Sequence, residues 1–119
     1  MTKAASYAIV TDSWVIEALQ TTISFTVPSN IAADSRSVIG FMLKTDHLDA
    51  MTLKLRMNGT EIWNWSWSGG SDDPAQFFQE VIGAGVVKPG ANVFSFDSSS
   101  GDARFLELSD IVVWFQVNI

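Results

Sequence analysis

Apolar and polar residues alternate with a period of two along much of the chain. Between residues 22 and 27, Ile23, Phe25 and Val27 are separated by serine and threonine. The last ten residues repeat this pattern, with an apolar residue at every second position from Ile111 to Ile119. Successive side chains of a β-strand point to opposite faces of its sheet. The alternation therefore predicts two half-buried strands, and we expect the C-terminal one to be central in its sheet.

Short apolar runs separated by turn-forming residues fill most of the remaining sequence. Asn58-Gly59, Pro89-Gly90 and Ser100-Gly101 mark three of the turns. Only the segment Asp73–Phe77, in which proline follows a potential N-cap aspartate, predicts a helical turn. About eight to ten short strands predict an all-β fold, an antiparallel β-sandwich of the jelly-roll type. The length of 119 residues predicts one domain over residues 1–119.

The chain is acidic, and its charge excludes several classes of partner. Seven basic residues against thirteen acidic ones give a formal net charge of -6. No basic cluster is available to neutralise phosphates, which argues against nucleic acid as a partner. No apolar stretch is long enough to predict a transmembrane helix. Cysteine is absent and no signal peptide is recognisable, so we expect a protein that is cytoplasmic or released without a standard signal.

The aromatic residues gather in one segment. Five tryptophans and eight phenylalanines stand against a single tyrosine, while only 17% of residues are charged. Trp63, Trp65 and Trp67 alternate with smaller residues at strand spacing, so all three are expected to share one face. Such a row of indoles is more than core packing obviously requires. We therefore treat this segment as the first candidate site.

The turn before this segment decides where the tryptophans point. Asn58-Gly59 is a strong signal for a hairpin with a two-residue turn. In that register Arg56 pairs with Glu61 and Leu55 pairs with Ile62, and the tryptophans lie on the outer face beside charged residues. In a three-residue loop with a bulge, the tryptophans fall into the core instead. The pairing of opposite charges and of two apolar residues favours the two-residue turn.

An exposed row of tryptophans beside polar groups suits a sugar ligand. A sugar ring presents apolar C–H groups on its faces and hydroxyls around its rim, so an indole stacks on the ring while charged groups bond the hydroxyls. The first hypothesis is a non-catalytic, lectin-like carbohydrate-binding module with a glycan as its partner. The open alternative places the tryptophans in the core or in a subunit interface. The candidate ligand-binding residues are Trp63, Trp65, Trp67, Lys54, Arg56 and Glu61.

The motifs of the second half of the chain resemble a known family. Leu53–Ile62 carries Asn-Gly after an alternating strand, Phe77–Ile82 follows a glycine-rich loop, and Val87–Phe96 contains Lys-Pro-Gly-Ala-Asn before a strand. In this order they resemble the galactose-binding-domain-like jelly rolls, which include carbohydrate-binding modules. The resemblance covers roughly residues 51–119. It implies a jelly roll and a carbohydrate ligand, and it transfers no binding residue, because sugar contacts vary within that superfamily.

Catalytic and metal chemistry receive little support from the sequence. His47 is the only histidine, and without cysteine it has no partners for a zinc site. No nucleophile motif and no phosphate-binding loop occur, so we expect neither an enzyme nor a cofactor. The loop Asp97–Asp102 offers oxygen ligands for calcium, which many members of the resembled family bind. Its composition is also that of an ordinary exposed turn, and no metal site is predicted.

A second hypothesis comes from segments that are apolar on both faces. Trp14–Ile16, Val38–Leu43 and Val112–Phe115 have this character. A sandwich of this size has one inner layer, so the surplus apolar faces favour contact with a neighbouring molecule. The alternative function is therefore a structural or assembly subunit, and we expect a homo-oligomer.

Overall fold

The computed structural model describes residues 2–13, 15–16, 22–45, 51–67, 73–98 and 106–119. Within this part of the chain all regular structure is β-strand, and no helix long and apolar enough to cross a membrane occurs. The strands are β1 (Lys3–Thr11), β2 (Val15–Ile16), β3 (Thr22–Val27), β4 (Ser37–Thr45), β5 (Met51–Met57), β6 (Thr60–Trp67), β7 (Asp73–Ile82), β8 (Gly90–Ser98) and β9 (Leu106–Asn118).

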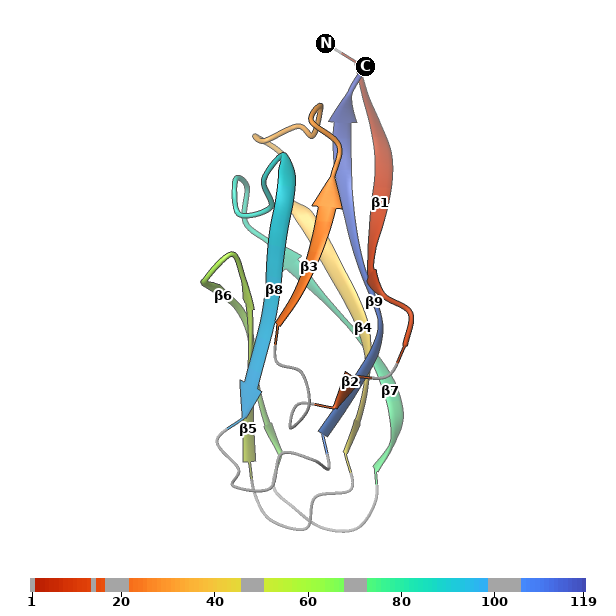
Figure 1. Cartoon of the computed structure of the whole chain (residues 1–119), viewed down its shortest axis with the longest axis vertical. Coiled ribbons are helices and arrows are strands. Elements are labelled where there is room, and N and C mark those ends of the chain that lie inside the picture. Colours follow the sequence, from red (N-terminus) through yellow and green to blue (C-terminus); the bar gives the residue numbers. More distant parts are fainter. Residues whose placement is uncertain (1, 14, 17–21, 46–50, 68–72, 99–105) are drawn as a thin grey trace.

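The strands form two antiparallel sheets that pack face to face (Figure 1). Sheet A has the order β1-β9-β4-β7, with β2 also paired to β9, and sheet B has the order β3-β8-β5-β6. From β3 to β9 the chain changes sheet at every connection except the β5–β6 hairpin. This arrangement is a jelly roll, so the predicted fold class is confirmed. The expected central position of the last strand is also confirmed, since β9 lies between β1 and β4.

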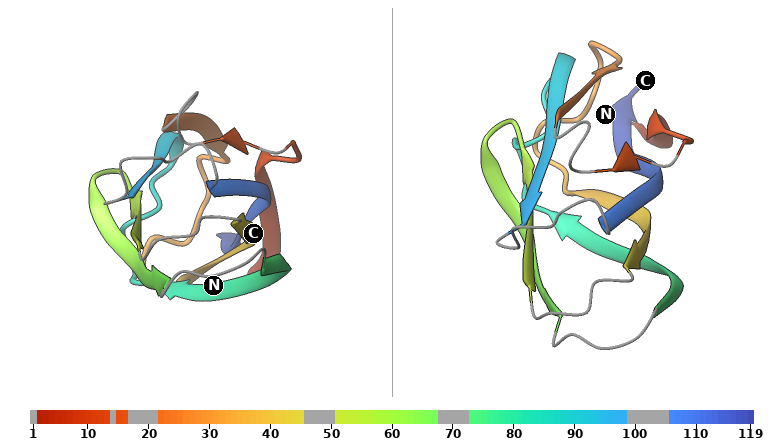
Figure 2. Two further views of the ribbon diagram at one scale, coloured as in Figure 1. Left: turned by 90° about the horizontal axis from the view of Figure 1, so that it is seen from below. Right: turned by 60° about the horizontal axis from the view of Figure 1, so that its bottom comes forward.

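The hydrophobic core fills the space between the sheets. Alternation places Ile39 and Phe41 of β4 against Leu53 and Leu55 of β5, and all four side chains are fully buried. In β3 the predicted pattern is confirmed, because its three apolar side chains point inward and its serine and threonines outward. Figure 2 shows the sandwich from one end, where β6 meets β7 along one side and β1 meets β3 along the other.

The turn motifs that carry the family resemblance form one hydrogen-bonded network. Asn58 and Gly59 have φ angles of 52° and 83°, as the predicted two-residue turn requires. The Asn58 amide donates to the oxygen of Asn92 at 2.8 Å, and its own oxygen accepts from the Val93 N–H at 2.9 Å. Asn92, only 1% exposed, also bonds both backbone groups of Lys88. These asparagines therefore join the hairpin turn to the loop before β8, which is a structural role.

The segment predicted as a helical turn is the beginning of a strand. Residues from Asp73 onward pair with β4 as part of β7. Proline lacks the N–H that an inner ladder needs, and strands therefore tolerate it at sheet edges. β7 is the edge strand of sheet A, so Pro74 fits there without a helix.

Candidate functional site

The β5–β6 hairpin begins in the predicted register and then departs from it. Next to the turn, Met57 pairs with Thr60 and Arg56 with Glu61, as expected. The following pair is Leu55 with Trp63, so Ile62 has no partner of its own and forms a β-bulge. The predicted pairing of Leu55 with Ile62 is wrong. The three-residue loop of the alternative is also wrong, but its consequence, tryptophans that turn toward the core, is confirmed for Trp63 and Trp65. A single extra residue reverses the faces of every side chain beyond it.

The bulge turns the tryptophans toward the core. Trp63 and Trp65 are half-buried and pack against the core residues of both sheets. Their ring planes lie 12° apart with centroids 6.2 Å from each other. Trp63 also contacts Phe41 edge-on at 5.0 Å and Phe78 at 5.3 Å. The expected outer position of these two indoles is thus corrected: they line the side of the sandwich where β6 approaches β7.

The charged residues predicted to flank the tryptophans lie on the outer face of sheet B. Arg56 forms an ion pair with Asp97 of β8 at 2.7 Å instead of with Glu61. Glu61 lies 3.9 Å from Lys54. These side chains point away from Trp63 and Trp65, which are on the other side of the sheet, so the structure does not assemble them into one surface. The Trp67 side chain lies outside the described residues.

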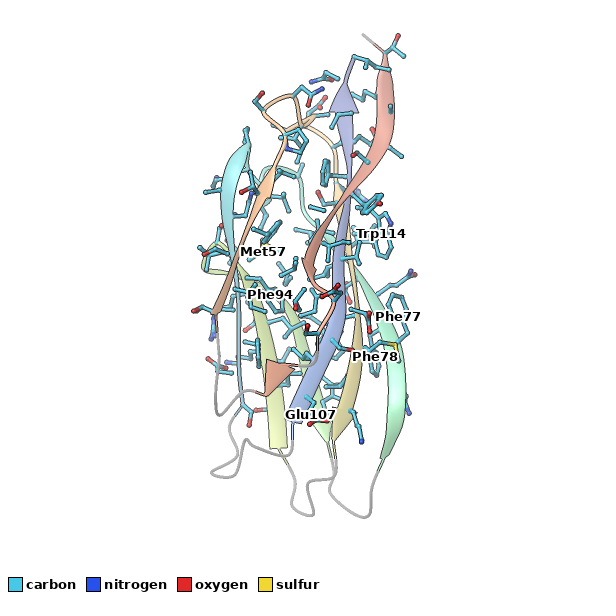
Figure 3. All side chains as sticks on the ribbon, turned by 45° about the vertical axis from the view of Figure 1, so that its right-hand side comes forward. Met57, Phe77, Phe78, Phe94, Glu107 and Trp114 are labelled. Carbon is cyan, nitrogen blue, oxygen red and sulfur yellow. The ribbon has the colours of Figure 1, made fainter. Side chains whose placement is uncertain are left out.

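A different aromatic surface occupies the outer face of sheet A. Tyr7 of β1, Trp114 of β9 and Phe77 of β7 are 61%, 37% and 48% exposed. Tyr7 pairs directly with Trp114 across the β1–β9 ladder. Figure 3 shows Trp114 and Phe77 projecting from the side of sheet A that faces away from Met57 and Phe94 of sheet B. We call this outer surface of sheet A the aromatic face; it is formed by the backbone of Gly40 and by the side chains of Tyr7, Ile9, Val38, Met42, Phe77, Gln79, Val81, Val112 and Trp114.

Gly40 brings two aromatic rings of this face together. A Cβ atom at Gly40 would lie 2.5 Å from Cζ of Phe77 and 2.7 Å from Cζ3 of Trp114. Both rings therefore reach across β4 to the same point, which any larger residue would occupy. Gly40 itself is buried beneath them. The missing side chain lets rings from β7 and β9 form one continuous surface over the middle of the sheet.

The residues of the aromatic face are uncharged, and charged residues lie around them. Lys44 and Glu107 lie opposite each other at one end of the sheet, and Lys3 at the other end pairs with Asp34 at 3.2 Å. Arg36 and Asp110 are exposed close to Val38 and Val112 in the sequence. Gln79 lies directly opposite Gly40 in the β4–β7 ladder and is exposed. Within the described part of the chain, no side-chain hydrogen bond uses Gln79. The face can therefore stack on an apolar surface and offers an unused amide beside the rings.

The pattern of apolar residues contains a signal for this surface. Val38–Leu43 and Val112–Phe115 are apolar on both sides, and their outward residues form the middle of the aromatic face. Tyr7 and Phe77 belong to other strands, and only the sheet order brings them to the same surface. The meeting of two rings over Gly40 depends on the registers of β4 with both neighbours.

Several sequence-based expectations fall on residues outside the described part of the chain. These include His47, Trp14 and most of the Asp97–Asp102 loop. Among the residues that are described, no group of three or more histidine, aspartate or glutamate side chains could hold a metal ion.

Comparisons with known proteins identify solved structures that have a similar fold. No protein-family model and no curated protein matches the sequence. Dimeric latent PorU from Porphyromonas gingivalis is similar over 98% of this chain and 13% of its own, with a TM-score of 0.69 and 12% identity. A family 35 carbohydrate-binding module from an environmental isolate is similar over 76% of this chain and 62% of its own, with a TM-score of 0.52 and 15% identity. The C-terminal domain of EclA, a sugar-binding protein, is similar over 95% of this chain and 79% of its own, with a TM-score of 0.53 and 9% identity.

At these identities the likeness is one of fold. This chain spans about an eighth of the PorU chain and less than two thirds of the family 35 module. The expected resemblance to carbohydrate-binding jelly rolls is confirmed at the level of the fold, because two of these three structures are sugar-binding domains with the same architecture.

Proposed function

We propose that residues 1–119 form a non-catalytic carbohydrate-binding module and that the glycan stacks on the aromatic face. One observation carries the proposal: Trp114 and Phe77 meet over Gly40 on the solvent side of sheet A. Exposed aromatic rings are unfavourable in water unless a ligand covers them. The C–H face of a sugar ring covers such a surface well, and the surrounding hydroxyls keep contact with water or with polar side chains.

The fold supports the same function without locating the site. Sugar-binding domains share this jelly roll. Because one fold serves many functions, the argument for a glycan comes from the chemistry of the aromatic face.

The residues predicted from the sequence form a second candidate location for the same ligand. Trp63 and Trp65 keep part of their surface exposed at the edge of the sandwich, beside Phe78. Trp67, Lys54, Arg56 and Glu61 complete the predicted set. The charged members of this set lie on the outer face of sheet B, so a glycan would have to pass around β6 to reach both groups. This geometry favours the aromatic face.

Binding to a panel of immobilised polysaccharides and to a glycan array tests the proposal. We expect the wild-type protein to bind at least one glycan with a change in tryptophan fluorescence, and Trp114→Ala to reduce that affinity at least tenfold. Lys54→Ala and Glu61→Ala are the corresponding variants for the alternative site on the β5–β6 hairpin, and we expect them to bind as the wild type does. A folded wild-type protein that binds no glycan would contradict the function. Loss of binding in the hairpin variants alone would move the site to β5 and β6.

Self-association through the aromatic face is the second candidate function, and the apolar character of the face favours it. The dimensions of the face argue against a stable dimer. Four strands about 4.8 Å apart and three rows of side chains about 7 Å apart give roughly 400 Å². A standard stable interface buries about 800 Å² on each partner. Sedimentation at micromolar concentration tests this alternative. It requires that the wild-type protein is a dimer and that the Ile9→Lys variant is a monomer.

A further inference from the structure

We infer that the aromatic face selects neutral polysaccharide chains over anionic ones and that Gln79 is its specificity-determining polar residue. The inference rests on the proposed carbohydrate-binding function and adds to it the ligand class. Four features of the face carry it: its flatness, its length, its lack of charge and the position of Gln79.

The flatness of the face excludes a ligand that needs a pocket. Because Gly40 has no side chain, the tips of Phe77 and Trp114 lie down over β4. Both rings remain more than a third exposed, so a ligand meets their surface from outside. A flat aromatic surface can stack on the broad face of a sugar ring inside a polysaccharide chain. It does not need to bind the end of that chain.

The aromatic residues extend across the whole sheet. Tyr7 lies on β1 and Phe77 lies on β7, at opposite edges of the four-stranded order. Three strand spacings separate these edges, a distance of about 14 Å. A single monosaccharide covers only part of this length. Tyr7 and Trp114 lie in line with Val38, and Phe77 lies four residues further along the sheet, opposite Met42. The three rings therefore follow a diagonal that suits several consecutive sugar rings.

The charge distribution disfavours an anionic glycan. No residue of the aromatic face is itself charged, and the cationic side chains of the described residues stand at its ends: Lys44 lies opposite Glu107, Arg36 precedes Val38 by two residues, and Lys3 is paired with Asp34. A uronate or sulfate group placed on the rings would lose its hydration without gaining a counter-charge, which is unfavourable. The formal net charge of -6 adds a general repulsion of polyanions.

Gln79 supplies the hydrogen bonds that a neutral sugar requires. It lies on β7 two residues after Phe77, so both side chains emerge on the same face. Its ladder partner is Gly40, the point where the two rings meet. An amide has one acceptor oxygen and two donor hydrogens, which match the hydroxyls around a sugar ring. Gln79 thus lies beside the stacking surface, and no side chain or backbone group of the described residues uses its amide.

The test compares neutral and anionic soluble polysaccharides by affinity electrophoresis and calorimetry. Mixed-linkage β-glucan and glucomannan are the neutral probes, and polygalacturonate and alginate are the anionic ones. We expect at least one neutral polymer to bind tenfold or more tightly than both anionic polymers. Affinity for oligosaccharides of the same linkage should rise with length beyond the monosaccharide.

Variants assign the effect to the face. Gln79→Ala should weaken neutral binding about three- to tenfold, the range for one or two hydrogen bonds. Gly40→Ala should weaken it at least tenfold, because the new methyl group displaces both rings. Gly83→Ala, where the added methyl group meets no atom within 4 Å, is the matched control and should bind as the wild type does. Circular dichroism verifies that each variant is folded.

The outcomes separate the inference from the function on which it rests. Equal or tighter binding of the anionic polymers, or unchanged binding by both Gln79→Ala and Gly40→Ala, would overturn the inference and leave a carbohydrate-binding module. Binding of no polymer by the folded wild type would overturn the proposed function itself. A stable dimer in sedimentation would show that a second copy covers the face, which also overturns the inference.

Discussion

The two sheets of the sandwich have similar inner faces and different outer faces. Inward, both present leucine, isoleucine, valine and phenylalanine to one shared core. Outward, sheet B shows the serine and threonines of β3 and the ion pairs of β5, whereas sheet A shows tryptophan, phenylalanine and tyrosine. Folding requires the inner faces to be apolar but leaves the outer faces free to be polar. The exposed rings of sheet A therefore point to contacts with another molecule.

The tryptophans of the two sheets provide the strongest test of this difference. Trp63 fills space between the sheets and contacts Phe41, so Trp63→Ala should lower the free energy of unfolding by about 3 kcal/mol. Trp114 covers only the outside of its sheet, and Trp114→Ala should lower it by about 1 kcal/mol. Denaturant unfolding of both variants measures the two losses. Equal losses would mean that Trp114 is needed for folding and would remove the reason to assign it a ligand.

A second pair of variants compares the outer faces directly. Phe77 on sheet A and Val93 on sheet B are both exposed apolar residues. Phe77→Ala should reduce the affinity for a neutral glycan at least tenfold, which corresponds to about 1.4 kcal/mol. Val93→Ala should leave the affinity unchanged, because its face is polar and lies on the other side of the molecule. A comparable loss in both variants, measured by calorimetry, would refute the distinction between the faces.

Much of the fold follows from local patterns, and the tryptophan positions show where such patterns stop. The alternation in β3 and β9 and the turn at Asn58-Gly59 each depend on neighbouring residues and are confirmed. The bulge had one local sign, the adjacent apolar residues Ile62 and Trp63 within an alternating run. Its position nevertheless depends on the core, which gains more from two half-buried indoles than from unbroken pairing. That balance cannot be read from spacing alone.

Deletion of Ile62 tests the role of the bulge. Without Ile62, Trp63 follows Glu61 directly, and the two residues keep their partners Arg56 and Leu55. The hairpin then has a regular ladder, and the tryptophans still point inward. We expect a folded protein that is less stable by about 1 kcal/mol through the loss of the half-buried side chain. Deletion of Asn64 is the control, since it would turn Trp65 to the outer face and should cost much more. Near-ultraviolet circular dichroism distinguishes the two. A similar spectrum for both would refute the assigned register.

The smallest expected effect concerns the polar face of sheet B. Asp97→Asn removes the negative charge of the ion pair between Asp97 and Arg56. Both side chains of this pair are partly exposed to solvent. Exposed pairs contribute little, so the loss of stability should stay below about 1 kcal/mol and should shrink further in high salt. Glycan binding on sheet A should not change. A large loss of either stability or binding would show that the ion pair supports more than its own face.

The aromatic face illustrates the other limit of sequence reasoning. Two-sided apolar segments in β4 and β9 were visible, but the sequence does not say which strand lies beside which. Gly40 is one of eight glycines, and its apolar neighbours place it within a strand, but nothing local shows which side chains lie above it. Its role becomes visible only when Phe77 and Trp114, from strands on either side, are found above it.

The position of β9 affects the order in which sheet A can form. β9 follows β1, β2 and β4 in the sequence, yet it pairs with all three of them. Until β9 is in place, β1 and β2 have no neighbour in sheet A, so the sheet forms by slow, long-range pairing. A folding intermediate that lacks β9 would expose apolar strands and would be prone to aggregation.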